Sequence, residues 1–205
     1  MRARPRCRTT PTVVVTPPAP DAIENLQFIR RTLEVSGSFT AVPGWGLVTV
    51  GVTAIGAGII ARQQATAQHW IAVWLGEAII GAVIVIWAMY AKAQRTGVSL
   101  LAAPGRRFAL GLAPPLIAGM VLTPILYYHR AIADVPGTWL LLYGTGVVTG
   151  GTYSIRIVPV MGTCFMVLGL ISLWTPAAWN PVCMMAGFAG LHIVFGYLIA
   201  RNYGG

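Results

Sequence analysis

Residues 70–90 read WIAVWLGEAIIGAVIVIWAMY, an apolar run with a single charged side chain, Glu77. A helix rises about 1.5 Å per residue, so this run is long enough to cross the hydrocarbon core of a membrane, which is about 30 Å thick. One similar run precedes it and four follow it, and the expected membrane helices cover residues 45–61, 70–90, 108–128, 137–153, 157–174 and 182–200. The sequence therefore predicts an all-α polytopic membrane protein with six transmembrane helices.

The composition of the whole chain agrees with this class. Of the 205 residues, 56% are hydrophobic and 9% are charged, whereas about a quarter of a soluble domain is charged. These values exclude a soluble globular enzyme, a disordered regulator and a disulfide-built secreted domain. The 3 cysteines form no CxxC pair, so we expect neither a structural disulfide nor a metal site.

The basic residues predict how the chain is oriented. The formal net charge is +9, but the Lys and Arg residues lie in short gaps between apolar runs, so we expect no nucleic-acid partner. With the N-terminus in the cytoplasm, twelve of the 14 Lys and Arg residues fall on the inner side. Cytoplasmic loops carry such an excess of positive charge. We therefore expect a multi-pass protein of the bacterial inner membrane, with both termini cytoplasmic and the lipid bilayer as its first partner.

Two segments precede the apolar runs. Residues 1–20 are rich in Arg and Pro and are expected to form a disordered tail. Residues 21–43 are interpreted as an N-terminal amphipathic cytoplasmic helix and a linker, and residues 44–205 as the transmembrane domain. A helix of this kind lies in the interface with its basic side chains near lipid phosphates, and here these side chains are Arg30 and Arg31.

Glycines predict where helices approach one another, because small residues let helix backbones pack closely in lipid. The fourth run contains a GxxxG motif at Gly146 and Gly150. Glycine also recurs every seven residues in the first and fourth runs, at positions 44, 51 and 58 and at positions 137, 144 and 151. This spacing is compatible with a 3+3 inverted repeat and with a compact six-helix bundle.

The third run contains Pro114, Pro115 and Pro124, which predict a kinked helix. Lipid offers no water to the carbonyls that proline leaves without a donor, so neighbouring helices or hydroxyls such as that of Thr123 are expected to bond them. Two interpretations remain open for this helix, a bent structural element and a wall of a transport site.

Two ionisable residues lie inside the predicted spans and are costly there. Glu77 is expected about 10 Å and His192 about 15 Å below the outer edge, so the two can meet if their helices touch. They form the candidate intramembrane polar site, for a proton or a ligand. The alternative is a satisfied polar pair that fixes the register of the helices.

Two further histidines, His69 and His129, lie near the predicted outer surface. Histidines on separate helices can ligate haem, which makes a haem-binding redox protein the third functional hypothesis. The sequence has no haem motif beside them and no Walker, HExxH or GxSxG motif, so we expect no cofactor, no metal and no catalytic residue.

Several short segments resemble a known group of proteins. Residues 24–32, ENLQFIRRT, lead into residues 38–46, SFTAVPGWG, and residues 190–196, GLHIVFG, precede IAR at residues 199–201. The chain from about residue 22 onward resembles a family of uncharacterised bacterial multi-span inner-membrane proteins. The resemblance implies a fold and a location but no activity. It draws attention to residues 38–43, which we interpret as a hinge between the surface helix and the bundle.

The sequence leaves the function to be chosen among three hypotheses. The first is a non-enzymatic protein that acts on a membrane or cytoplasmic protein partner through its basic face. The second is a small carrier or channel that uses Glu77, His192 and the kinked third helix. The third is the haem-binding protein. The oligomeric state has no signature in the sequence.

Overall fold

The computed structural model describes residues 23–29, 39–97 and 99–203. The chain separates into two units, Met1–Leu33 and Glu34–Gly205. In the first unit, residues 23–29 form a helix with exposed side chains, within the segment predicted to be an interfacial helix. The predicted tail of residues 1–20 and the basic pair Arg30 and Arg31 lie outside the described residues.

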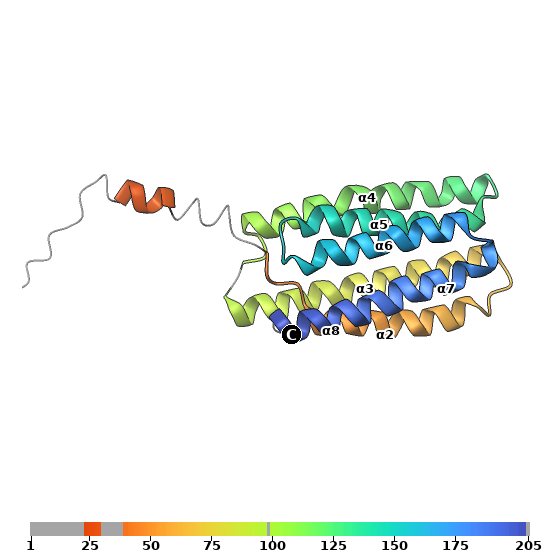
Figure 1. The fold of residues 1–205 in the computed structure, drawn as a ribbon, viewed down its shortest axis with the longest axis horizontal. Helices are drawn as coiled ribbons and strands as arrows, with labels where there is room; N and C mark the ends of the chain where they lie inside the picture. The colour runs from red at the N-terminus through yellow and green to blue at the C-terminus, as the bar shows by residue number, and fades with distance from the viewer. Residues whose placement is uncertain (1–22, 30–38, 98, 204–205) are drawn as a thin grey trace, which may run out of the picture. The chain divides into compact units, whose positions relative to one another are not determined.

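The second unit is built from helices. Figure 1 shows them as long, roughly parallel rods joined by short connections. Their bounds are α2 (Gly44–Ala61), α3 (Ala67–Thr96), α4 (Ala103–Tyr128), η1 (Ile132–Asp134), α5 (Val135–Gly151), α6 (Ile157–Trp174), η2 (Ala177–Trp179), α7 (Asn180–Met184), η3 (Met185–Leu191) and α8 (His192–Tyr203). Within the described residues the only strand-like pairing is a single bridge between Phe39 and Ser154, so the all-α prediction is confirmed there.

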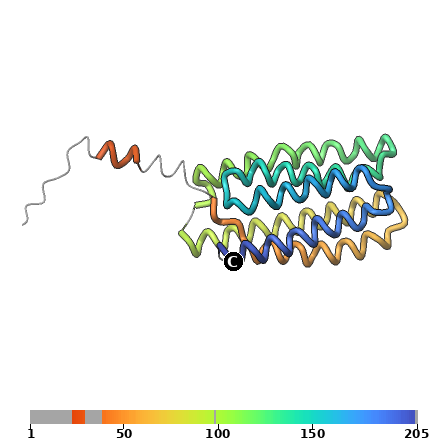
Figure 2. The backbone as a smooth tube through the Cα atoms, in the orientation of Figure 1, coloured from red at the N-terminus to blue at the C-terminus, as the bar shows by residue number. Residues whose placement is uncertain are grey.

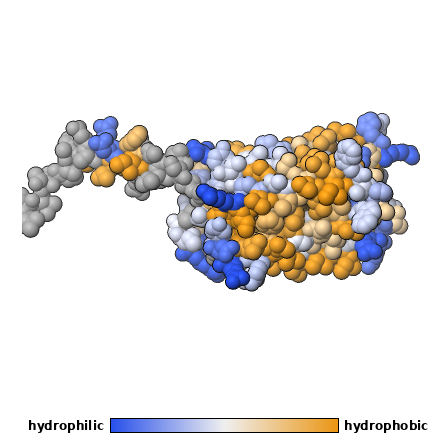
Figure 3. Space-filling model, viewed as in Figure 1, coloured by the Kyte–Doolittle hydropathy of each residue, from blue (hydrophilic) through white to orange (hydrophobic). Residues whose placement is uncertain are grey.

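Within residues 23–29, 39–97 and 99–203, five helical stretches are long and apolar enough to cross a membrane: α2, α3, α4, α6 and Ala177–Tyr203. The fourth predicted span corresponds to α5, which has 17 residues. On the face seen in Figure 3, hydrophobic residues cover the middle of the bundle and hydrophilic residues gather at both ends. By the length and composition of its helices, the chain is a multi-pass membrane protein.

Local signals in the sequence explain where several helices begin and end. The hydroxyl of Thr66 caps α3 by accepting a hydrogen bond from the backbone N–H of His69, and Gly97 ends that helix with a left-handed φ of 67°. Proline occupies the first turn of α4, α5 and α7, where a missing N–H costs least.

The helices of the second unit form two halves. One half contains α2, α3 and α8, and the other contains α4, α5 and α6, as Figures 1 and 2 show. The stretch from α7 to α8 connects the two halves. By contrast, α3 and α4 follow one another in the chain but make almost no contact. In the most apolar windows of α3 and α4, 17% and 6% of the residues are buried, compared with 50% in α2, so α3 and α4 face outward.

The glycines spaced by seven residues bring helix backbones together. A methyl group on Gly144 would lie 2.6 Å from the carbonyl oxygen of Gly162 in α6, and one on Gly44 would lie 2.2 Å from the backbone nitrogen of Ala200 in α8. The glycines of α2 therefore face η3 and α8, whereas those of α5 face α6. In this structure the seven-residue spacing marks the faces on which helices pack.

The last long helix is not a uniform α-helix. Residues Met185–Leu191 form a π-helical stretch between α7 and α8, where the sequence predicts one continuous helix. A methyl group on Gly187 would lie 2.4 Å from Leu140 of α5, so this stretch passes very close to the other half of the bundle. Such wide turns are frequent at functional sites, and His192 follows this one directly.

Residues 39–43, here named the strap, close the end of the bundle at which α2 begins. The backbone N–H of Phe39 donates to the carbonyl of Tyr153 at 2.7 Å, and the hydroxyl of Ser154 donates to the carbonyl of Phe39 at 2.7 Å. The side chain of Phe39 is 2% exposed, and its ring lies 5.1 Å from that of Phe108 in α4. The strap is therefore fixed to the bundle, while residue 38 of the predicted hinge lies outside the described residues.

A buried lysine ties the strap to two helices of its own half. Lys92 is a residue of α3, and its ammonium group donates to the carbonyl of Val42 at 3.0 Å and to the carbonyl of Tyr203 at 3.1 Å. The second bond places a positive charge at the C-terminal end of α8, where the helix dipole favours a cation. Lys92 therefore has a structural role in addition to the orientation signal that its charge provides.

Candidate functional site

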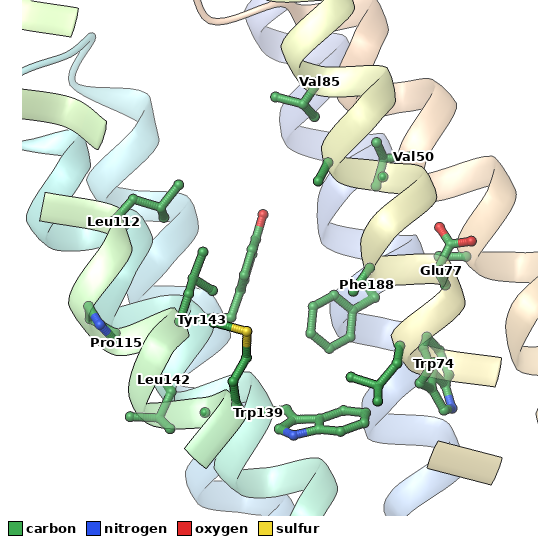
Figure 4. A pocket seen from close by; sticks show the side chains of 18 of the residues that line it. Val50, Trp74, Glu77, Val85, Leu112, Pro115, Trp139, Leu142, Tyr143 and Phe188 are labelled. Atoms are coloured by element: carbon green, nitrogen blue, oxygen red, sulfur yellow. The ribbon is translucent and has the colours of Figure 1, made fainter. Parts of the chain in front are cut away.

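A cavity of about 310 Å³ lies between the two halves and is bordered by α3 and α4. Its walls come from both halves, and Figure 4 shows Trp139 and Tyr143 of α5 across from Phe188 of the π-helical stretch. Glu77 and His192, the two candidate polar residues, both line this cavity. The two residues therefore belong to one cavity, but each has a different hydrogen-bond partner.

Glu77 lies at the edge of the cavity on α3. Its side chain is 8% exposed, and its Oε1 atom accepts a hydrogen bond of 2.7 Å from the hydroxyl of Thr53 in α2. In Figure 4 the carboxylate lies on the side of α3 that faces α2. Val50, three residues before Thr53, and Ala54, the residue after it, line the cavity as well. The cavity therefore extends to the place where Thr53 holds Glu77.

His192 lies at the first position of α8 and is 2% exposed. Its Nε2 atom is hydrogen-bonded to the hydroxyl of Tyr143 at 2.8 Å, across the boundary between the two halves. The imidazole ring packs among aromatic rings, with Phe165 at 5.3 Å and Phe188 at 6.2 Å between centroids. This bond therefore joins α8 to α5 and fixes the ring within an apolar shell.

Aromatic side chains connect the two halves beside the cavity. We name this group the aromatic cluster, and its members are Trp70, Trp74, Trp139, Tyr143, Phe165 and Phe188. The indole rings of Trp70 and Trp139 are stacked, with centroids 5.8 Å apart and planes 18° apart. Trp74, Trp139, Tyr143 and Phe188 contribute to the cavity walls.

Some of the buried nitrogen atoms around the cavity have hydrogen-bond partners and others do not. The indole N–H of Trp139 donates to the hydroxyl of Thr123 in α4 at 2.8 Å, which is the polar contact between α4 and the aromatic cluster. By contrast, Trp74 Nε1 and His192 Nδ1 are buried and have no hydrogen-bond partner within the described part of the chain. Buried polar groups of this kind are uncommon and call for an explanation.

The prolines of the third predicted span lie inside α4, and Pro115 lines the cavity. Proline removes the N–H that would bond the carbonyl four residues earlier, which for Pro115 is that of Gly111. The hydroxyl of Thr149 in α5 donates to the Gly111 carbonyl at 2.6 Å. A neighbouring helix therefore supplies the missing donor, as expected, but through Thr149. The hydroxyl of Thr123 instead donates to the Gly119 carbonyl at 2.7 Å.

The GxxxG motif of α5 holds α4 in place behind the cavity. A methyl group on Gly150 would lie 2.8 Å from the carbonyl oxygen of Phe108, and one on Gly146 would lie 3.1 Å from Leu112. The two glycines thus face α4, whereas the glycines spaced by seven residues face α6. Helix α5 is packed closely on two sides, which makes it a rigid support for Trp139 and Tyr143.

The two histidines of the haem hypothesis lie at helix ends. His69 lies in the first turn of α3, and its Nδ1 atom is 3.0 Å from the Thr66 hydroxyl. His129 follows the last residue of α4, and its ring packs edge-on against Tyr128 at 5.4 Å. Neither histidine lines the cavity.

Sequence reasoning did not find Thr53 or Tyr143, the hydrogen-bond partners of the two candidate residues. A hydroxyl inside an apolar span is the only signal that either residue carries, and several other hydroxyls share it. No protein-family model, curated protein or solved structure matches this chain.

Proposed function

We propose that the protein crosses the bacterial inner membrane six times and binds a small hydrophobic molecule, which reaches the cavity from the bilayer between α3 and α4. The sixth span in this count is α5, whose 17 residues match the lower limit for crossing the hydrocarbon core. The first residues of α2 and the last of α8 pack together, as an even number of spans requires. The excess of Lys and Arg supports placing this end in the cytoplasm.

The observation that carries the proposal is the cavity with its wide-set neighbouring helices. Ligand sites are concave, mostly apolar and contain a few polar groups that orient the ligand, and their volumes begin at about 300 Å³. This cavity has about 310 Å³, apolar and aromatic walls and the side chains of Glu77, Thr123, Tyr143 and His192. Because α3 and α4 hardly touch and both line the cavity, we expect a molecule dissolved in the bilayer to enter between them.

We favour binding or carriage over catalysis, in line with the second of the three hypotheses. Within the cavity walls, the hydrogen-bonded polar side chains pair across helices, Glu77 with Thr53, His192 with Tyr143 and Thr123 with Trp139. These pairs fix the shape of a site and orient its polar groups. The hypothesis of a protein partner depends on the basic face that includes Arg30 and Arg31, and the resemblance to the inner-membrane family adds no activity.

The proposal is tested by photolabelling with 3-(trifluoromethyl)-3-(m-iodophenyl)diazirine, a small apolar probe that partitions into membranes. We expect saturable labelling of cavity residues such as Met120 and Trp139 in the full-length protein in vesicles. The matched variants are Gly119→Leu and Gly76→Leu. Gly119 lines the cavity and a methyl group there would meet only Leu142, at 3.7 Å, whereas a methyl group on Gly76 meets nothing within 4 Å and Gly76 lies outside the cavity walls.

Gly119→Leu is expected to abolish the saturable component by filling the cavity, and Gly76→Leu is expected to leave it unchanged. Labelling that never saturates, or that is equal in the two variants, would rule out a binding site between α3 and α4.

A further inference from the structure

We infer that the ligand of the cavity is a lipophilic aromatic cation, with Glu77 as its counter-ion and the aromatic cluster as the surface on which it stacks. This inference rests on the proposed function, because it names the chemical class of the molecule that the same cavity binds. Three features of the walls carry it, namely the single carboxylate, the charge balance of the lining and the aromatic rings.

The charge balance of the cavity favours a cation. Among the described residues of the lining, Glu77 is the one acidic side chain and there is no Lys or Arg. A carboxylate at this depth is costly unless it is paired, and within the described part of the chain Glu77 accepts its hydrogen bond from the neutral hydroxyl of Thr53. A cationic ligand brings the missing counter-charge, whereas an anion would be repelled by Glu77 and would find His192 but no Lys or Arg among the described lining residues.

The aromatic cluster lies where the body of such a ligand would rest. Trp74 precedes Glu77 by three residues on α3, so the two side chains lie on the same side of the helix. The ring of Trp74 is 5.9 Å from that of Phe188, which is 5.4 Å from that of Tyr143. Figure 4 shows Tyr143, Phe188 and Trp139 bordering the open space. Aromatic faces attract organic cations, most strongly when the contact is shielded from water.

The composition of the walls fits an organic cation better than a metal ion. Inorganic cations need several oxygen, nitrogen or sulfur ligands around them. In the described ranges no group of three His, Cys, Asp or Glu side chains is close enough together to hold a metal ion. One carboxylate with aromatic walls instead matches an ammonium group attached to an apolar body. The lateral path between α3 and α4 requires a molecule that dissolves in the bilayer.

The experiment uses two competitors of nearly equal shape in the photolabelling assay. Benzyltrimethylammonium carries a positive charge, and neopentylbenzene is its neutral analogue with carbon in place of nitrogen. The quantity measured is the ratio of the concentrations at which each compound suppresses labelling of the cavity residues. Comparing this ratio between wild-type protein and Glu77→Gln removes the different partitioning of the two compounds into the membrane.

We expect Glu77→Gln to weaken the cation relative to the neutral compound by about tenfold or more, which is equivalent to about 1.4 kcal/mol. Unchanged competition by neopentylbenzene shows that the variant keeps its cavity. An unchanged ratio would overturn the inference while leaving the binding site in place, and a complete absence of saturable labelling in wild-type protein would remove the proposed function itself.

A second measurement needs no variant and therefore does not depend on how Glu77→Gln folds. In wild-type protein, phenylmethanesulfonate, an aromatic anion of similar size, is compared with benzyltrimethylammonium. We expect the cation to compete and the anion to fail at the same concentration. Equal competition by the anion would overturn the inference.

Discussion

Replacing Gly144 by alanine tests whether the α5–α6 contact depends on the absence of a side chain. A methyl group at this position would lie 2.6 Å from the carbonyl oxygen of Gly162 and 2.7 Å from the backbone nitrogen of Met166. Both neighbours are backbone atoms of α6, so they cannot move aside without moving the helix. Helix α6 must therefore shift away from α5 along this face.

The size of the effect follows from two opposing contributions. Forcing an extra methyl group into a closely packed interface costs about 1–3 kcal/mol. Alanine is the better helix former by about 1 kcal/mol, which offsets part of that cost. We therefore expect Gly144→Ala to lower the free energy of unfolding by up to about 2 kcal/mol. The matched variant Gly76→Ala, whose methyl group meets nothing within 4 Å, should be neutral or more stable by up to about 1 kcal/mol.

The assay is reversible unfolding of both variants in mixed micelles, followed by circular dichroism and compared with wild-type protein. The expected difference between the two variants is about 1–3 kcal/mol, with Gly144→Ala the less stable. If Gly144→Ala is as stable as Gly76→Ala, the helices do not approach as closely as the structure describes, and the packing role of the glycines in α5 is wrong.

Two further predictions concern buried polar contacts. Lys92→Met removes the donor to two backbone carbonyls and should lower the free energy of unfolding by about 1–3 kcal/mol. Arg95→Met, at an exposed position of the same helix, should change the free energy of unfolding by less than about 0.5 kcal/mol. Equal effects of the two substitutions would contradict a structural role for Lys92. Thr149→Val leaves the Gly111 carbonyl in α4 without its hydroxyl donor and should lower the free energy of unfolding by about 0.6–1.7 kcal/mol in the same assay. The effect should exceed that of Thr163→Val, because the Thr163 hydroxyl donates to the Pro159 carbonyl within its own helix α6. A Thr149→Val protein as stable as Thr163→Val would show that the bond to α4 contributes nothing.

The positions of the helices could be predicted from hydrophobicity, but their polar ends could not. The predicted span 157–174 has the same bounds as α6. The predicted span 70–90 is shorter than α3, which continues to Thr96 and includes Lys92. A charged residue normally marks the end of an apolar run. Here the carbonyls of Val42 and Tyr203 accept hydrogen bonds from Lys92, and those residues are far away in the sequence.

The glycine spacing showed that α2 and α5 have closely packed faces, but not which helices pack there. Gly51 of α2 faces Ile193 in α8, whereas Gly144 of α5 faces Gly162 in the next helix of the chain. The same periodic pattern thus serves two different neighbours. Regularly spaced glycines indicate that a helix has a face suited to close packing, but they do not indicate which helix packs against it.

The candidate site could be anticipated in part, because burying an ionisable side chain in a membrane is costly in any fold. That cost singled out Glu77 and His192, and both line the cavity. Their partners Thr53 and Tyr143 escaped prediction because each bond joins helices that are distant in the sequence. The π-helical turn before His192 also escaped, since no residue type in 185–191 is specific for it.

Binding of a lipophilic cation beside Glu77, in the cavity between α3 and α4, is tested most directly by a crystal structure of the full chain with 4-bromobenzyltrimethylammonium, in which anomalous scattering locates the bromine. We predict a bromine peak among Trp139, Tyr143 and Phe188 with the ammonium group directed toward Glu77. A peak elsewhere, or none at a concentration that suppresses photolabelling, would contradict it.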